Sequence, residues 1–439
     1  MNTPPQAHEN SGRPAAPSFG EALQTWAKIG LTSFGGPAGQ IAMMHRVLVD
    51  EKRWLSEKIY LTALSFCTLL PGPEAMQLAT YAGWRLHGVK GGLAAGLLFV
   101  LPGAVVILAL SILYALYGAQ PLAAALFVGV KAAVLAIVVE ALLRISKRSL
   151  KDQTEWLIAA AAFLAIFFFK APFPVLVLAA GAFGFWRGRS NSRIEASVAL
   201  AAIPVSRTLG TIALWLVIWI VPLLAIGAMF GFDHVLARLA WFFSKLAVVT
   251  FGGAYAVLAY MAQDVVQHYG WLKAGEMLDG LGLAETTPGP LILVTEFVGF
   301  LAAYRNGGGA PLVMGVIGAL VTLWATFAPC FLWIFAGAPY VERIASMPRL
   351  KSALSAITAA VVGVIVNLTV WFALHVIFKT VTESSVGPLH LTRPDIASVD
   401  WIAAALAALA AILLFRLHAG IMTVLAVCGA LGMLLGRLA

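Results

Sequence analysis

Charged residues are scarce in this sequence. Asp, Glu, Lys and Arg make up only 11% of its 439 residues, against about 25% in soluble domains. Hydrophobic residues reach 61%, the mean hydropathy is +0.91, and several uncharged apolar runs are long enough to cross a bilayer as helices. An ordinary soluble protein is therefore excluded, and the sequence predicts an all-α polytopic membrane protein.

Cysteines are few and cofactor motifs are missing. Cys67, Cys330 and Cys428 are scattered through apolar segments without a CxxC pair or clustered histidines, so we expect no disulfide framework and no metal site. There is no GxxxxGK[ST] motif, and no GxGxxG motif that opens a βαβ unit. We therefore expect no cofactor and no direct use of ATP. The 29 Lys and Arg against 20 Asp and Glu fit basic cytoplasmic loops better than a nucleic-acid partner.

What the sequence does contain is an internal repeat. Three motifs recur with a shift of 217 residues, since Phe34-Gly35-Gly36, Trp54-Leu55 and Pro71-Gly72-Pro73 return as Phe251-Gly252-Gly253, Trp271-Leu272 and Pro288-Gly289-Pro290. Residues 28–73 share 14 identities in 46 ungapped positions with the second copy, where unrelated apolar sequences share about 3 or 4. Further on the shift becomes 227, which pairs Pro102 with Pro329. The sequence therefore predicts two homologous halves.

The domain organisation follows from this repeat. We expect a disordered cytoplasmic tail at 1–19, an N-terminal repeat at 20–190, a basic cytoplasmic linker at 191–207, a linking transmembrane helix at 208–230 and a C-terminal repeat at 231–439. The linking helix has no counterpart in either half. An even number of crossings in each half would therefore invert the second half relative to the first.

Loop charges favour this inverted-topology repeat. Cytoplasmic loops are rich in Lys and Arg, and the first half has Arg144, Lys147, Arg148 and Lys151 in one loop. The equivalent segment of the second half, 380–400, carries three carboxylates and one arginine. We therefore expect the first loop inside and the second outside. This corresponds to an inner-membrane protein with a cytoplasmic N-terminus and a periplasmic or external C-terminus.

The FGG and PGP motifs interrupt helices. They divide residues 20–50 and 56–87 into pieces of about 12 to 15 residues, each about half a bilayer long. Gly-Gly and Pro both end helices, and such breaks survive at membrane depth only when they are buried in protein or line a wet cavity. The charges of 46–58 favour re-entrant hairpins, while broken full spans remain the alternative.

Helices that start after Gly36, Pro73, Gly253 and Pro290 would point their N-termini at the middle of the membrane. Unpaired N–H groups and the positive end of the helix dipole make such a start a site for an anion. A single break of this kind is explained by packing alone. Four symmetric breaks favour a substrate site.

Charged residues in apolar segments complete the predicted site. Lys28 and Lys245 are equivalent by the repeat and are candidates to neutralise a dianion, the alternative being that each reaches an interface or a local partner. Glu74 follows PGP at a helix start, where it serves either as a cap or as a proton-coupling group. The expected substrate-binding residues are Lys28, Ser33, Phe34, Gly35, Gly36, Pro37, Thr68, Pro71, Gly72, Pro73, Lys245, Thr250, Phe251, Gly252, Gly253, Thr287, Pro288, Gly289 and Pro290.

Together these motifs make the sequence similar to the chromate ion transporter family in its long, two-domain form. The resemblance rests on FGGP, a downstream Trp-Leu, PGP and a Gly-rich span with Leu101-Pro102-Gly103, and it covers 20–439. It implies a bacterial or archaeal cytoplasmic-membrane protein that exports chromate and so confers resistance. Site roles are implied only for the FGGP and PGP positions and their second-half mates. Ala254 stands where the second half would repeat Pro37, which weakens the equivalence of the two breaks.

Two other functions stay open at this point. A transporter of sulfate or another tetrahedral oxyanion is the nearest alternative, because chromate matches sulfate in shape and charge. An integral membrane enzyme would use Glu74, Glu285 and His87, but these do not resemble a metal site or a nucleophile with its base, so no enzyme is expected. Export is expected to use the membrane potential or the proton motive force. The expected partners are chromate or sulfate and the lipid bilayer, and the oligomeric state is open, a homodimer included.

Overall fold

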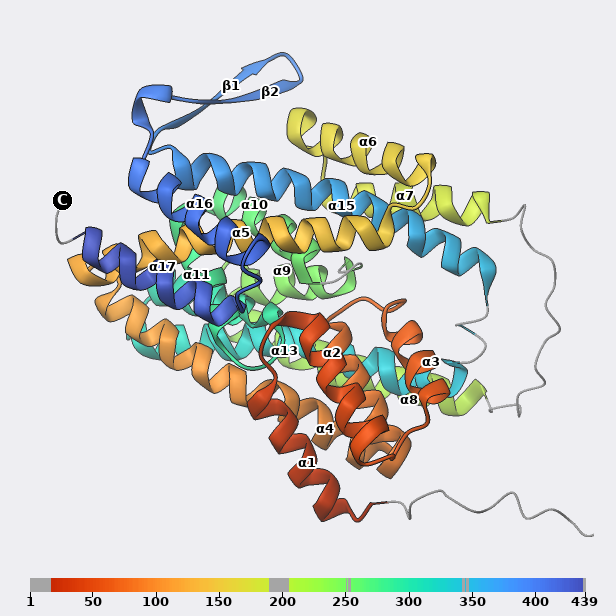
Figure 1. Cartoon of the computed structure of the whole chain (residues 1–439). Helices are drawn as coiled ribbons and strands as arrows, with labels where there is room; N and C mark the ends of the chain where they lie inside the picture. Colours follow the sequence, from red (N-terminus) through yellow and green to blue (C-terminus); the bar gives the residue numbers. More distant parts are fainter. Residues whose placement is uncertain are drawn as a thin grey trace, which may run out of the picture.

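The computed structural model describes residues 17–188, 205–249, 251, 254–341, 344 and 347–436, which form a helical assembly with one β-hairpin (Figure 1). Among these residues, five helices are long and apolar enough to cross a membrane. They are Glu74–Tyr117, Pro121–Ser149, Val205–Phe230, Pro311–Tyr340 and Pro348–Ile377. The chain is thus a multi-pass membrane protein built from α-helices, as its composition predicts.

Within residues 17–188 and 205–230, the first half and the linking helix contain eight α-helices and one π-helical turn. In chain order they are α1 (Phe19–Thr32), α2 (Gly36–His45), the π-helical η1 (Arg46–Glu51), α3 (Glu57–Cys67), α4 (Glu74–Tyr117), α5 (Pro121–Ser149), α6 (Gln153–Phe169), α7 (Phe173–Arg187) and the linking α8 (Val205–Phe230). His87 and Gly88 have non-helical backbone angles and kink α4, so this long element consists of two helices in sequence.

The second half repeats this order. Its elements are α9 (Val235–Val249), α10 (Ala254–Gln263), the π-helical η2 (Asp264–His268), α11 (Ala274–Thr286), η3 (Leu291–Leu293), α12 (Val294–Asn306), α13 (Pro311–Gly337), η4 (Ala338–Tyr340), α15 (Pro348–Ile377), β1 (Val381–Val386), β2 (Leu389–Pro394), η5 (Ile396–Ser398), α16 (Trp401–Phe415) and α17 (Ile421–Leu435). The helices α9, α10 and α11 correspond to α1, α2 and α3, and α12 with α13 corresponds to the kinked α4.

Helices end and begin at the glycine and proline motifs. α1 ends at Thr32 and α2 begins at Gly36, and at this junction Gly35 and Gly36 have φ angles of 88° and 71°. Glycine adopts this left-handed conformation without the steric cost that a Cβ would add, which explains the Gly-Gly pair. In the second half Phe251 N–H donates to the Val249 carbonyl at 3.1 Å, as Phe34 N–H donates to Thr32 at 3.0 Å. Thr250, Gly252 and Gly253 lie outside the described residues.

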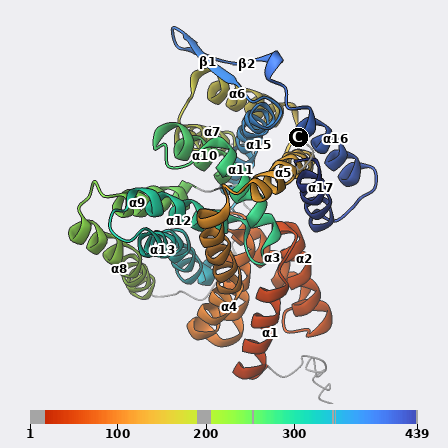
Figure 2. The ribbon, with the colours of Figure 1, turned by 90° about the vertical axis from the view of Figure 1, so that its left-hand side faces the viewer.

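The two halves are interlocked by exchange of helices. Figure 2 shows α5 of the first half beside α16 and α17, and α15 of the second half beside α6 and α7. α13 packs on α4, α8 and α9. A continuous core of buried apolar side chains runs through both halves, so they form one packed body.

The segment 380–400 differs from the expected acidic loop. It forms an antiparallel hairpin in which Val381 pairs with Pro394 and Val386 pairs with Leu389, and Gly387 turns the chain with φ 60°. The all-α expectation is therefore correct for the rest of the described chain and wrong for this hairpin. Val, Thr and Leu interspersed with polar residues, as in this segment, are typical of a strand.

Candidate functional site

A cavity of about 490 Å³ is lined by residues of both halves, and we call it the basic cavity. Its volume is typical of sites that bind small molecules. Its walls come from α2, the ends of α3 and α5, and the starts of α4, α10 and α15. They comprise Pro37, Ala38, Ile41, Ser65, Thr68, Leu69, Glu74, Ala141, Arg144, Ile145, Arg148, Ser149, Lys151, Tyr255, Lys351, Leu354, Ser355 and Thr358.

Three of the predicted helix starts border the basic cavity. α2 contributes Pro37 and Ala38 from its first turn, α4 contributes its first residue Glu74, and α10 contributes its second residue Tyr255. The first N–H groups of a helix have no partner within it and carry the positive end of the dipole. The start after the second PGP motif is buried instead, because Leu291–Leu293 packs against other helices. The structure thus brings three of the four predicted helix starts to one cavity.

The charge on the cavity wall is mainly positive. Arg144, Arg148, Lys151 and Lys351 lie on it, against the single carboxylate of Glu74. Arg148 acts electrostatically on Glu74. An excess of cations beside helix starts favours an anion over a neutral or cationic ligand.

These cations differ in how far they are already neutralised. Arg144 forms an ion pair with Glu140, one turn earlier in α5. Within the described part of the chain, no carboxylate lies at ion-pairing distance from Arg148, Lys151 or Lys351. These three are therefore the cations best placed to bind a small anion.

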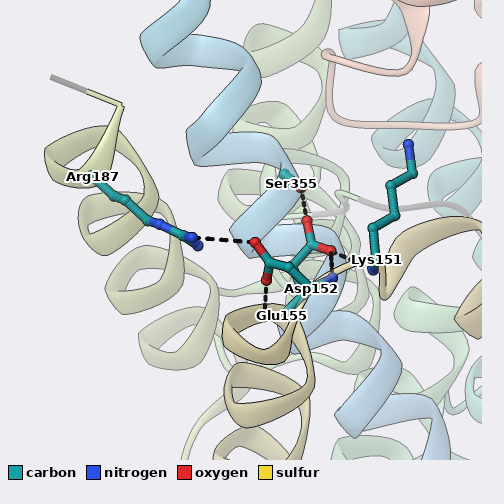
Figure 3. A network of polar contacts seen from close by, with 5 residues as sticks. All are labelled: Lys151, Asp152, Glu155, Arg187 and Ser355. Carbon is teal, nitrogen blue, oxygen red and sulfur yellow. Dashed lines mark hydrogen bonds and ion pairs between the residues drawn. The ribbon is translucent and has the colours of Figure 1, made fainter. Parts of the chain in front are cut away.

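A network of polar contacts fixes the corner between α5 and α6 (Figure 3). The Asp152 carboxylate accepts from Glu155 N–H at 2.8 Å, and Glu155 accepts from the N–H groups of Lys151 at 2.6 Å and Asp152 at 3.3 Å. The Glu155 N–H and the Arg187 guanidinium, 3.2 Å away, hold the pKa of the Asp152 carboxyl below its usual range. Ser355 of α15 donates to Glu155 at 2.5 Å. The corner that carries Lys151 is thereby tied to the second half.

Threonine hydroxyls on the wall already donate to helix carbonyls. Thr68 donates to Ser65 at 2.8 Å, and Thr358 donates to Leu354 at 2.8 Å. Their protons are in use, so these groups are weak donors to a ligand. Recognition of an anion in this cavity would depend on the cations and helix starts rather than on the threonines expected from the sequence.

Tyr255 connects the basic cavity to a buried carboxylate. Its hydroxyl donates to Glu285 at 2.8 Å, and Glu285, three residues before the second PGP motif, is only 6% exposed. Arg144 and Glu140 of α5 act electrostatically on both groups. A titratable carboxylate from the second half therefore stands directly behind the wall.

The first FGG break and the second PGP break touch each other. Gly289 N–H donates to the Ser33 carbonyl at 2.8 Å. The Gln40 side chain, 1% exposed, donates to the carbonyls of Gly289 at 2.6 Å and Ser33 at 3.3 Å. Ser33 and Gly289, both predicted site residues, thus join the two halves with the help of Gln40 and lie off the cavity wall.

The two predicted lysines lie elsewhere. Lys28 is exposed on α1. Lys245 lies 4.0 Å from the Asp264 carboxylate and over the Tyr260 ring, 5.4 Å from its centre. Local contacts, which the sequence left as the alternative, thus describe Lys245 in this structure.

Some of the predicted motif residues line the cavity, and others form the helix breaks without reaching it. Pro37, Thr68 and Glu74 line the cavity. Phe34 is 41% exposed, and Thr287 donates to the Ala284 carbonyl at 2.9 Å. Gly35, Gly36, Pro71, Gly72, Pro73, Phe251, Pro288 and Pro290 form the helix breaks themselves and do not line the cavity.

Sequence reasoning missed the cavity cations. The sequence predicts Arg144, Arg148 and Lys151 only as part of a cytoplasmic loop, and Lys351 is not among the predicted site residues. Their common signal was a concentration of basic residues at helix ends, which also marks anion sites. Only the packing of α5 against α15 shows that they meet.

The basic cavity therefore belongs to a duplicated membrane protein with helix starts and cations around one space. The family model described as chromate transporter matches residues 20–185 and 237–433. The chain belongs to the chromate transporter family. This confirms the resemblance inferred from the FGG and PGP motifs.

Relatives of the chromate transporter family match most of the chain. A chromate transport protein of Pseudomonas aeruginosa is 33% identical over 366 residues, or 81% of this chain and 82% of the relative. One of Cupriavidus metallidurans is 29% identical over 357 residues, or 80% and 82%. An uncharacterized transporter of Methanocaldococcus jannaschii is 27% identical over 365 residues, or 82% and 86%. No solved structure matches the chain.

Proposed function

We propose that this chromate transporter family member exports chromate from the cytoplasm across the inner membrane and so gives chromate resistance. The proposal rests on the basic cavity, whose wall contains three of the predicted helix starts, four cations and one carboxylate. A tetrahedral dianion matches this charge and these donors. The names of the Pseudomonas and Cupriavidus relatives support chromate as the ion. The protein acts as a transporter and not as an enzyme.

The membrane potential is sufficient to drive export. Each charge moved across 100 mV is worth about 2.3 kcal/mol, so an inside-negative potential favours expulsion of a dianion by about 4.6 kcal/mol. This corresponds to more than three decades of concentration gradient. The proton motive force is the second source of energy if a carboxylate of the cavity exchanges protons.

The proposed topology places the two halves in opposite orientations. The single linking helix α8 and the loop charges support a cytoplasmic N-terminus and a periplasmic or external C-terminus. The basic cavity then opens to the cytoplasm, and the β-hairpin faces outside. In this arrangement α1 with α2, and α3 with the start of α4, are re-entrant hairpins, as are their second-half equivalents, α9 with α10 and α11 with α12.

Sulfate or another tetrahedral oxyanion is the alternative substrate. Helix starts and cations respond to charge and size, in which chromate and sulfate are alike. Nothing in the wall of the basic cavity is specific to chromium.

The proposal is tested by uptake of radiolabelled chromate into inverted membrane vesicles that contain the full chain. We expect accumulation in energised vesicles and loss of accumulation when an ionophore collapses the electrical potential, and the effect of excess sulfate measures how far the two oxyanions share the cavity. Vesicles without the protein are the control. Absence of accumulation would contradict export, and faster movement of labelled sulfate would make sulfate the substrate.

Glu74 is the proposed proton-coupling group, because it lies on the cavity wall beside Arg148. We expect Glu74→Gln to flatten the dependence of chromate transport on pH, since an amide neither binds nor releases a proton. The measurement is the initial uptake rate across a pH series at constant electrical potential. Glu51→Gln, an exposed carboxylate away from the cavity, should keep the wild-type profile. An unchanged profile in the Glu74 variant removes the residue from the mechanism.

A further inference from the structure

A second, smaller cavity of about 40 Å³ lies beneath the β-hairpin, and we call it the hairpin pocket. Its wall includes Lys170, directly after α6, and three side-chain amides, those of Gln263, Gln267 and Asn367. An ammonium group and several amides form a donor set suited to an anion.

The hairpin pocket and the basic cavity lie at opposite ends of the same helices. α6 has 17 residues, so its ends are about 25 Å apart. Lys151, just before α6, lines the basic cavity, and Lys170, just after it, lines the hairpin pocket. α15 likewise contributes Thr358 to the first space and Leu374 to the second. The two spaces are thus placed as the inner and outer sites of a transport path would be.

The internal repeat relates the two spaces. Ala141 and Arg144 line the basic cavity, and the shift of 227 residues (368 − 141 and 371 − 144) pairs them with Leu368 and Trp371. Both of these mates line the hairpin pocket. The second copy lacks Arg144, and Lys170 from the first half supplies a cation there instead.

A carboxylate already lies on the wall of the hairpin pocket, beside Lys170. Glu383 of β1 accepts from Lys170 Nζ at 2.5 Å and from Gln267 Nε2 at 3.3 Å. Lys170 is held at the end of α6 in the left-handed conformation, with φ 49°. With the carboxylate in place, the pocket has room for only a few water molecules.

We propose that the hairpin pocket is a second oxyanion site, and that the Glu383 carboxylate fills it as a tethered competitor of the transported anion. The Lys170–Glu383 pair is partly exposed on both sides, and pairs of this kind hold weakly. An arriving oxyanion therefore displaces the carboxylate and moves the hairpin away. The identity of that oxyanion rests on the proposed function, whereas the site itself rests on the contacts of Glu383.

The test is the number of labelled oxyanions bound per chain by the purified full-length protein, measured separately with chromate and with sulfate. At an oxyanion concentration that saturates only the basic cavity, we expect one ion per chain in the wild type, and a second in Glu383→Ala because the competitor is gone. Adding Lys170→Gln to that variant should return the number to one. Asp395→Asn removes a carboxylate near the same hairpin, retains its cap to Ala397 N–H, and should bind as the wild type does.

The outcomes separate this inference from the proposed function. If Glu383→Ala binds no additional ion while the wild type binds one, the second site is wrong and the function stands. If Glu383→Ala with Arg148→Gln still binds one ion that Lys170→Gln abolishes, the hairpin pocket binds on its own. Binding of sulfate but not chromate at both sites would overturn the proposed substrate and leave the second site intact.

Discussion

Replacing Arg148 with glutamine is expected to lower kcat/KM for chromate transport by about ten- to hundredfold. Arg148 lies on the wall of the basic cavity, beside Glu74 at the start of α4. A hydrogen bond to a charged group contributes about 1.5–3 kcal/mol, and 1.4 kcal/mol is a factor of ten. The measurement is the initial rate of labelled chromate uptake by inverted vesicles over a concentration series, divided by the amount of folded transporter.

Lys147 provides the matched control for this prediction. It precedes Arg148 on α5, is exposed, and does not line the cavity. Lys147→Gln removes the same charge from the same loop, and we expect transport within about twofold of the wild type, because exposed charges are screened by salt. Equal losses in both variants would assign the effect to the loop as a whole. Normal transport in Arg148→Gln would show that chromate does not use this cavity.

Gly103→Ala is expected to destabilise the protein strongly. A Cβ at Gly103 of α4 would lie 2.1 Å from the Pro288 carbonyl oxygen and 2.5 Å from Leu293 Cδ1. The carbonyl belongs to the second PGP break, whose backbone is fixed through Gly289 by Ser33 and Gln40. Overpacking of this kind costs about 1–3 kcal/mol, and more where backbone must move. The measurement is the apparent melting temperature of purified protein by size-exclusion chromatography of heated samples, which we expect to fall.

Gly20→Ala is the control for this steric argument. Gly20 lies in the first turn of α1, and a Cβ there meets no atom within 4 Å. Alanine favours a helix over glycine, so the melting temperature should be unchanged or slightly higher. If Gly103→Ala melted like the wild type, α4 and the second PGP break would not be in close contact.

The helix breaks could be predicted from the sequence because their cause is local. Two adjacent glycines at Gly35 and Gly36 adopt left-handed angles, and prolines end helices by losing a donor. The repeat then transferred each break to the second half. The direction of the chain places the N-terminus of a helix after each break. Three of these four predicted helix starts lie at the cavity.

The lining of the site could not be predicted because its cause is tertiary. Arg148 and Lys351 are about two hundred residues apart in sequence and meet only because α15 packs against α5. Lys245 is the reverse case. The repeat predicts it as a site residue, but in the structure it lies near the Asp264 carboxylate. Single-residue signals in an apolar helix do not distinguish a ligand contact from a local ion pair.

The exchanged helices constrain how this chain is made. α5 (Pro121–Ser149) is covered by α16 and α17, which leave the ribosome long after it. Until they emerge, α5 has lipid or the translocation machinery in place of its final neighbours. Contacts between such distant segments form late and slowly. A stop codon before Trp401 would therefore leave not a shortened transporter but a first half that cannot finish its own folding.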